Sequence, residues 1–458
     1  MKRKNLLKLI VGVSLAAVMA ISIPLMSGCA APGPAPTPEL EPVKIGYIGF
    51  FASDIGKNTE RAAEIFIDEI NAAGGVLGGR PVVLVKADTG QDVEEGIKAY
   101  EYLVEVEHVD MVISGCVDDV TLGWLPRCAE YRMPTVDTWT SAIVAIDEVE
   151  RDYERFKPYF MTCMDDYFLG QGMVHFARDF LNPVMGWDTM VLLNEDTAYG
   201  VGTAELVYDA ISPQANIEVL DHIVYDIETI DFAPIFARCE AANPDFIYHI
   251  SSVNTIIPVS QYVESMVPLP ITGIAVEAMG EQFWDDTGGM AAGYSTCHPH
   301  MGIGLQGNCD PRTQAFIDTW KARYGDSRPT GPIFSGYSTY YGLYQAFNSA
   351  EYVYEQGLGS GFEPLDAWVE AMEGEPGEIT LMKDGEVFAK WDFYGPGVYE
   401  PVTGRNHPHN LVFDPLGESG TGLPGIMVTQ WHEGGTYDCI FPPKYATGEF
   451  EMPWWIEE

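Results

Sequence analysis

Residues Val43–Asp88 read VKIGYIGFFASDIGKNTERAAEIFIDEINAAGGVLGGRPVVLVKAD, and their pattern of apolar residues and glycines is the clearest structural signal in the chain. The apolar run at its start predicts a buried strand, and the apolar residues at 62–70 recur at the spacing of a helix with one buried face. Gly74 and Gly75 end that helix, and residues 80–85 return to a strand. The stretch is therefore one βαβ unit, which is usually right-handed and places ligands at the carboxyl ends of its strands.

The same alternation of strand, polar loop and helix continues along the chain. Further strands are expected at 109–114, 133–137, 189–194, 217–225, 245–251 and 270–275, with helices at 93–106, 122–131, 169–180, 202–211, 232–242 and 255–265. Repeated βα units predict an α/β fold of doubly wound, Rossmann-like parallel sheets. A second lobe is expected to begin near Tyr159, and a cleft between two such lobes is a usual site for a small ligand.

The first 42 residues predict export and anchoring rather than folded structure. Residues 1–28 combine a basic head with an apolar core, as in a signal peptide, and residues 29–42 form a proline-rich tether. The segment Met26-Ser-Gly-Cys29 resembles the lipobox of bacterial lipoproteins, which implies a lipid on Cys29 and a membrane-anchored protein outside the cytoplasm. The alternative is an ordinary secretory signal with a free cysteine.

The charge of the chain excludes some partners. Its formal net charge is −42, with 67 acidic against 25 basic residues. Phosphates would be repelled, so nucleic acid and anionic lipid headgroups are not expected as partners. The acidic balance is compatible with a cationic ligand, although a diffuse acidic surface is more often a solubility feature.

Cysteines and histidines raise the alternatives of a disulfide and a metal site. Eight cysteines include Cys29, and Cys297 with Cys309 brackets a short loop, so this pair is the first candidate for a disulfide. The segments 297–300 (CHPH) and 407–409 (HPH) contain nitrogen and sulfur ligands for zinc or copper. Their spacing fits no standard metal motif, and the prolines indicate exposed turns, so neither a metal nor another cofactor is expected.

Several segments together carry a resemblance to a known family. They are INAAGGVLGGRP at 70–81, DTAYGVG at 196–202, DFAPIF at 231–236, ANPDFIY at 242–248, HPHN at 407–410 and VTQW at 428–431. In order and spacing the chain resembles the type I periplasmic solute-binding proteins, in particular the leucine/isoleucine/valine-binding or receptor family ligand-binding group that serves ABC importers. The resemblance covers nearly all of the chain from Val43.

The resemblance implies two lobes joined by a multi-strand hinge. Residues 43–157 and 298–382 would form the N-terminal lobe, and residues 158–297 and 383–458 the C-terminal lobe. A small solute would bind in the cleft, the lobes would close around it, and an ABC transporter permease would recognise the closed form. This role requires no enzymatic step and no cofactor, and we expect the chain to act as a monomer. A receptor subunit that signals to a membrane partner would have the same sequence features and is the alternative.

The resemblance also assigns ligand contacts to loops that follow strands. The loop at 116–121 contains Asp118 and Asp119, and the next loop contains Trp139, Thr140 and Ser141. In the second lobe, Tyr199 matches a tyrosine that covers the ligand, and Glu277 matches an acidic residue that accepts its ammonium group. These seven residues are the predicted ligand-binding site.

Two features depart from the amino-acid binders of this family. Asp118 and Asp119 stand where those proteins usually have serine or threonine, and a carboxylate there would repel the carboxylate of an amino acid. Trp139 adds a large aromatic wall, which suits stacking or a cation over its face. The loops therefore favour a cationic, amide-like or aromatic solute over a simple branched-chain amino acid. Helix capping by Asp118 and Asp119 is the structural alternative.

Motifs of common enzymes are missing from the sequence. It contains no GxxxxGK[ST] phosphate loop, no GxSxG nucleophile elbow and no HExxH metal motif. The glycines at 74–79 follow a helix instead of preceding one, so they do not form a dinucleotide loop. The sequence therefore predicts a binding protein.

Overall fold

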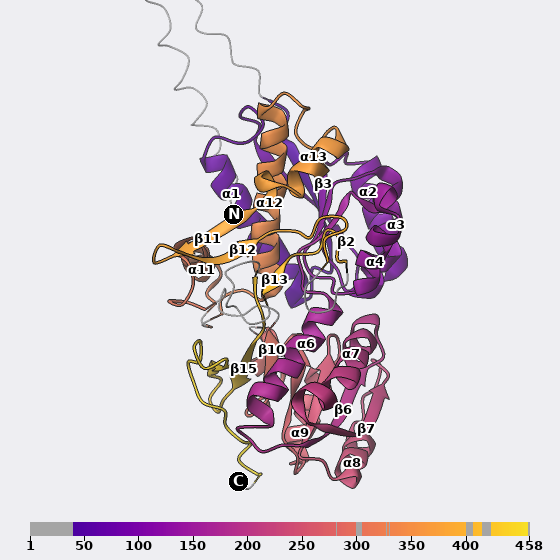
Figure 1. The fold of residues 1–458 in the computed structure, drawn as a ribbon, viewed down its shortest axis with the longest axis vertical. Helices are drawn as coiled ribbons and strands as arrows, with labels where there is room; N and C mark the ends of the chain where they lie inside the picture. Colours follow the sequence, from indigo (N-terminus) through magenta and orange to yellow (C-terminus); the bar gives the residue numbers. More distant parts are fainter. Residues whose placement is uncertain are drawn as a thin grey trace, which may run out of the picture. The chain divides into compact units, whose positions relative to one another are not determined.

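The computed structural model describes residues 40–280, 282–298, 305–326, 328, 330–399, 406–414 and 423–456 (Figure 1). The expected signal peptide, Cys29 and most of the proline-rich tether lie outside these residues, as does His300. Among the helices in the described ranges, none is long and apolar enough to cross a membrane.

The βαβ unit predicted from the opening stretch is confirmed. β1 (Val43–Gly49) and β2 (Val82–Asp88) pair in parallel along their whole length. Between them, α1 (Asp54–Ala72) begins where the side chain of Ser53 caps its first turn. The helix ends before Gly74, whose φ of +111° is favourable only for glycine.

The first parallel sheet has the strand order β2-β1-β3-β4-β5. Its further elements are α2 (Val93–Glu105), β3 (Met111–Gly115), α3 (Asp118–Tyr131), β4 (Thr135–Asp137), α4 (Ile143–Arg151), α5 (Tyr153–Phe156) and β5 (Tyr159–Met161). The sheet extends past the boundary expected at residue 157, because β5 pairs in parallel with β4. The third helix begins earlier than the expected Leu122, so Asp118 and Asp119 lie in its first turn rather than in a loop.

The second parallel sheet has the strand order β7-β6-β8-β9. Its elements are α6 (Asp166–Phe176), the short π-helical turn η1 (Ala177–Leu181), β6 (Thr189–Glu195), α7 (Ala198–Ala215), β7 (Glu218–Tyr225), α8 (Ala233–Ala242), β8 (Phe246–Ser251), α9 (Ile256–Glu264) and β9 (Ile271–Ala275). The predicted order of strands and helices is confirmed, and the two parallel sheets confirm the predicted α/β class. The helix α7 also begins early, so Tyr199 lies in its first turn.

Later segments of the chain pack against the two parallel sheets or form smaller sheets of their own. They comprise η2 (Glu277–Met279), α10 (Phe283–Asp286), β10 (Ser295–His298), α11 (Pro311–Tyr324), α12 (Phe334–Glu355), α13 (Leu365–Met372), η3 (Glu375–Gly377), β11 (Ile379–Lys383), β12 (Glu386–Trp391), β13 (Phe413–Asp414), β14 (Leu423–Pro424), β15 (Met427–Trp431) and β16 (Tyr437–Phe441). Figure 1 shows α12 alongside α1, and the hydroxyls of Tyr340 and Tyr344 each donate to Glu69 of α1 at 2.8 Å. The antiparallel sheet β10-β15-β16 adjoins β9, where the Ala275 N–H donates to Thr296 at 2.9 Å.

The cysteines that the structure describes are all buried, free thiols. The expected pairing of Cys297 with Cys309 is therefore wrong. Cys297 lies within β10, whereas Cys309 precedes α11 and donates its S–H to Gln314 Oε1 at 3.7 Å. The two thiols belong to different elements, and their closeness along the sequence does not bring them together.

Candidate functional site

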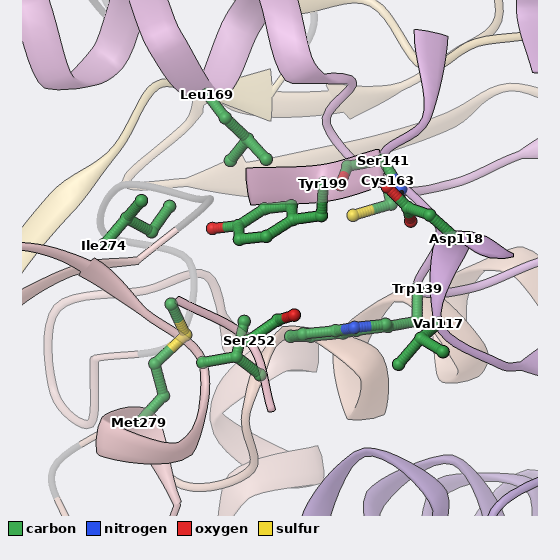
Figure 2. A pocket seen from close by; sticks show the side chains of 11 residues that line it. Val117, Asp118, Trp139, Ser141, Cys163, Leu169, Tyr199, Ser252, Ile274 and Met279 are labelled. Carbon is green, nitrogen blue, oxygen red and sulfur yellow. Dashed lines mark hydrogen bonds between the residues drawn. The ribbon is translucent and has the colours of Figure 1, made fainter. Parts of the chain in front are cut away.

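One pocket is lined by segments from both parallel sheets. It contains about 410 Å³ of empty space, part of which is open to solvent. Its walls come from the ends of β3, β4 and β5 on one side and from α6, α7, β8, β9 and η2 on the other. The lining residues are Val117, Asp118, Trp139, Ser141, Cys163, Leu169, Tyr199, Ser252, Ile274, Val276 and Met279 (Figure 2).

Asp118 is the charged group of this pocket. Its side chain is only 5% exposed, and its Oδ1 accepts a 3.0 Å hydrogen bond from the backbone N–H of Ser141. Its Oδ2 has no hydrogen-bond partner among the residues described. Burial raises the pKa of Asp118 to about 7, and the neighbouring carboxylate of Asp137 acts in the same direction. Among the described residues that line the pocket, no lysine, arginine or histidine neutralises this carboxylate.

Asp137, at the end of β4, shapes the loop that carries the aromatic wall. It is fully buried, and its Oδ1 accepts the backbone N–H groups of Trp139 at 3.1 Å and Thr140 at 3.0 Å. Burial raises the pKa of Asp137 to about 6, although these hydrogen bonds favour its charged form. The Thr140 hydroxyl donates to Thr121 at 2.6 Å, so Thr140 supports the loop and does not line the pocket.

Tyr199 and Trp139 provide the aromatic surface. Figure 2 shows their rings on opposite sides of the pocket. Tyr199 is 7% exposed and Trp139 8%, and the Tyr199 hydroxyl has no hydrogen-bond partner in the described part of the chain. Burial, reinforced by the carboxylate of Glu195, raises the pKa of Tyr199 well above its usual value. The hydroxyl is therefore neutral and available to a bound molecule.

Several lining residues were not predicted. Cys163 follows β5 and Ser252 follows β8, so the general rule that ligands bind at strand ends gives a signal for both. The Ser252 hydroxyl donates to Glu195, which also accepts the Val253 N–H at 3.1 Å. Leu169, on α6, carries no such signal, because its position depends on how that helix packs.

The remaining predicted site residues lie elsewhere. Asp119 is exposed and lines neither this pocket nor the adjoining one. None of the described side chains caps α3, whose N-cap residue is Val117, so the capping hydrogen bond of the structural alternative is not made, although both aspartates lie in the first turn, where the helix dipole favours them. Asp118 therefore lines the pocket, whereas Asp119 does not.

Glu277 lies in the adjoining pocket, which shares Ser252 and Val276 with the first and contains about 1070 Å³ of empty space, part of it open to solvent. Its Oε2 accepts the backbone N–H groups of Thr255 at 2.7 Å and Ile256 at 3.3 Å, at the start of α9. Burial raises the pKa of Glu277 to about 7. The carboxylate therefore has a structural partner, and its contact with a ligand stays a prediction.

The histidines of the HPH segment are buried, so the prediction of exposed turns is wrong for them. His407 Nδ1 lies 2.8 Å from Asp165 Oδ2, and His409 Nε2 lies 2.7 Å from Glu373 Oε1. The ring of His409 also stacks on Phe160 at 3.9 Å. Within the described ranges, no group of three or more His, Cys, Asp and Glu side chains is arranged to hold a metal ion.

Comparisons with known proteins agree with this architecture. A family model described as periplasmic binding protein matches residues 42–391. A curated relative from Brucella abortus (strain 2308), Leu/Ile/Val-binding protein homolog 7, is 22% identical over 337 residues, which cover 70% of this chain and 79% of the relative.

Solved structures share the fold. One from Silicibacter pomeroyi has a TM-score of 0.70 at 21% identity and covers 91% of this chain and 100% of its own. A solute binding protein of an ABC transporter from R. palustris, solved in complex with benzoate, has a TM-score of 0.64 at 14% identity and covers 91% of this chain and 99% of its own. The fold is that of type I periplasmic binding proteins, and the chain belongs to the periplasmic binding protein family, a family of solute-binding proteins rather than enzymes.

Proposed function

We propose that this chain is the extracytoplasmic solute-binding component of an ABC importer. The observation that carries the proposal is the pocket at which strand ends of both parallel sheets meet, in a chain of this family. The similar protein from R. palustris is part of an ABC transporter, which supports the same assignment here. The chain would capture a solute without altering it and deliver it to a permease.

The proposed ligand is one small organic molecule of the amino-acid or aromatic class. The name of the Brucella relative refers to leucine, isoleucine and valine, and the R. palustris protein was solved with benzoate. Trp139 and Tyr199 line the pocket and offer aromatic faces to such molecules. We propose Asp118, Trp139, Ser141 and Tyr199 as direct contacts, with Glu277 at the adjoining pocket.

Lobe closure is the proposed working motion. The sequence divides the lobes into residues 43–157 with 298–382 and residues 158–297 with 383–458, and the pairing of β5 with β4 moves the first crossover from residue 157 to a point after Met161. A ligand favours closure only by the amount by which it binds the closed form more tightly than the open form. Ligand contacts contributed by both lobes, such as Asp118 and Tyr199, meet this requirement.

Attachment to the membrane is proposed through a lipid on Cys29. The Met26-Ser-Gly-Cys29 segment and the proline-rich stretch behind it support this assignment. Mass spectrometry of the protein purified from membranes tests it, because a lipidated Cys29 would be the first residue. A mature chain that begins elsewhere, or one with an unmodified cysteine, would contradict it.

A thermal-shift screen over amino acids, aromatic acids, amides and amines tests solute binding. A ligand that binds only the folded protein raises its melting temperature by mass action. We expect a hit whose shift is lost in Tyr199→Ala. Tyr208→Ala is the matched control, because Tyr208 lies on the same helix but is 49% exposed and does not line the pocket. A shift that survives in Tyr199→Ala would contradict the site.

A further inference from the structure

The pocket contains a carboxylate oxygen that no described protein group satisfies. Asp118 is nine-tenths buried or more, lines the pocket, and keeps its Oδ2 free of hydrogen-bond partners among the described residues. A buried polar atom without a partner is unfavourable, and a buried charge without one is more so. A solute that donates a hydrogen bond to Oδ2 would offset this cost.

Three backbone donors of the loop after β4 are already engaged by the protein. The Ser141 N–H donates to Asp118, and the N–H groups of Trp139 and Thr140 donate to Asp137. The loop after β4 therefore directs these three donors at the protein's own carboxylates. They are not available to hold the carboxylate of a solute.

The charges around the pocket also disfavour an anion. None of the described residues that line it is a lysine, arginine or histidine. The buried carboxylates of Asp137 and Asp166 act on Asp118 as like charges, and Glu195 lies behind Ser252. An anionic group placed here would meet repulsion in a poorly solvated site, whereas a cation would be attracted.

The rest of the lining suits the body of an organic cation. The faces of Trp139 and Tyr199 flank the pocket, and aromatic faces attract cations by their quadrupole. Figure 2 shows Ile274 and Met279 at the end away from Asp118, with Leu169 above Tyr199. This arrangement places the charge-bearing end beside Asp118 and apolar surface at the other end.

We infer that the pocket selects an organic cation without a carboxylate, whose ammonium or amidinium group donates to Asp118 Oδ2 while its hydrocarbon or aryl body lies between Trp139 and Tyr199. This inference rests on the proposed function and narrows its solute class. It separates this chain from relatives whose names or bound ligands are amino acids or benzoate.

Matched compounds test the inference by isothermal titration calorimetry. Benzylamine, benzamide and benzoate share one ring and differ in charge, and isoamylamine is leucine without its carboxylate. We expect benzylamine to bind at least about tenfold more tightly than benzoate, and isoamylamine at least about tenfold more tightly than leucine. A charge-assisted hydrogen bond to Asp118 supplies an affinity difference of this size. Benzamide is expected between benzylamine and benzoate. Tighter binding of benzoate, benzamide or leucine would overturn the inference.

Substitution of the Asp118 carboxylate is the second test of the inference. Asp118→Asn keeps the shape of the side chain, and we expect it to weaken benzylamine about tenfold or more and to strengthen benzoate. Asp119→Asn, on the exposed neighbour, is the control and should change neither affinity. An Asp118→Asn protein that binds benzylamine like the wild type would overturn the assignment, and a melting curve of each variant verifies that it is folded.

The outcomes distinguish this inference from the proposed function. Binding of leucine or benzoate in preference to the amines, with loss of that binding in Tyr199→Ala, would leave solute binding intact and overturn only the charge assignment. Failure of all these compounds would overturn the cation assignment, and failure of the wider solute screen as well would overturn the proposed function.

Discussion

Asp54, at the start of α1, lies against the backbone of Gly280, which follows η2. A Cβ atom placed on Gly280 would lie only 2.0 Å from Asp54 Oδ2. Asp54 belongs to the helix that packs beside the first sheet, whereas Gly280 follows the last strand of the second. Asp54 and Glu277 both line the adjoining pocket, so this close approach lies beside that pocket.

Gly280→Val should weaken solute binding by at most about tenfold, because the new side chain would displace the flexible carboxylate of Asp54 and crowd the Glu277 carbonyl at 3.0 Å, beside the adjoining pocket. The backbone at Gly280 has φ −71° and ψ 151°, which any residue adopts, so the substitution adds no strain in the chain itself. Calorimetry with the best hit of the thermal-shift screen measures the loss. Gly395→Ala is the control, since its Cβ would meet only Val398 at an ordinary 3.7 Å.

The contact with Asp54 can be checked by a second substitution. If the clash is the cause, Asp54→Ala combined with Gly280→Val should recover most of the affinity, since neighbouring substitutions that share a contact are not additive. Full loss in the double variant would show that the backbone of this segment, and not its contact with Asp54, sets the affinity.

Tyr199→Phe should stabilise the ligand-free protein by about 1 kcal/mol, because it removes a buried hydroxyl without a partner. The ring and its packing remain. Urea denaturation of the ligand-free protein measures the change, and the same variant should bind a solute that uses the hydroxyl more weakly. Destabilisation by a similar amount would mean that the hydroxyl is satisfied in the free protein.

The fold could be predicted because its signals are local. Each strand is an apolar run and each helix a periodic pattern, so the order of βα units follows from short stretches such as Val43–Asp88. β5 was expected in the second lobe, although it pairs with β4. Its three residues carry no sign of the sheet that they join, because pairing is decided by distant parts of the chain.

The site could be predicted only in part. Asp118, Trp139, Ser141 and Tyr199 were expected near the ligand because the family resemblance assigns ligand contacts to these loops, and the structure brings the four residues to one pocket. Glu277 also follows a strand, yet its carboxylate turns to the amino end of α9. The position of a residue in the sequence shows at which end of the sheet it lies, but not where its side chain points. That direction depends on the hydrogen-bond donors around the side chain.

Glu277→Ala should lower the stability of the ligand-free protein by about 1 to 2 kcal/mol, because two N–H groups at the start of α9 lose their acceptor. Urea denaturation without ligand measures this change. Glu277→Gln keeps one oxygen acceptor and should recover part of the loss. If Glu277 served only to bind a ligand, Glu277→Ala would stabilise the free protein at neutral pH, because burial that raises the pKa of a carboxyl to about 7 is unfavourable.

Asp118→Asn should stabilise the ligand-free protein more at pH 8 than at pH 5. The pKa of Asp118 is raised to about 7 in the folded protein, above the usual carboxyl value of 3.8, chiefly by burial. Between these values the folded protein holds a proton that the unfolded chain has released. The free energy of unfolding of the wild type therefore falls as the pH rises through this window, and stays reduced above it.

Asparagine does not ionise, so its advantage over the wild type should grow by about 2 kcal/mol from pH 5 to pH 8, as the size of the pKa shift implies. Urea denaturation of both proteins at the two pH values measures it. Asp119→Asn is the matched control, and as a surface substitution it should stay within about 0.5 kcal/mol of the wild type. An advantage of Asp118→Asn that is equal at both pH values would mean that Asp118 carries a partner for its charge, and the unsatisfied carboxylate on which cation selection depends would not exist.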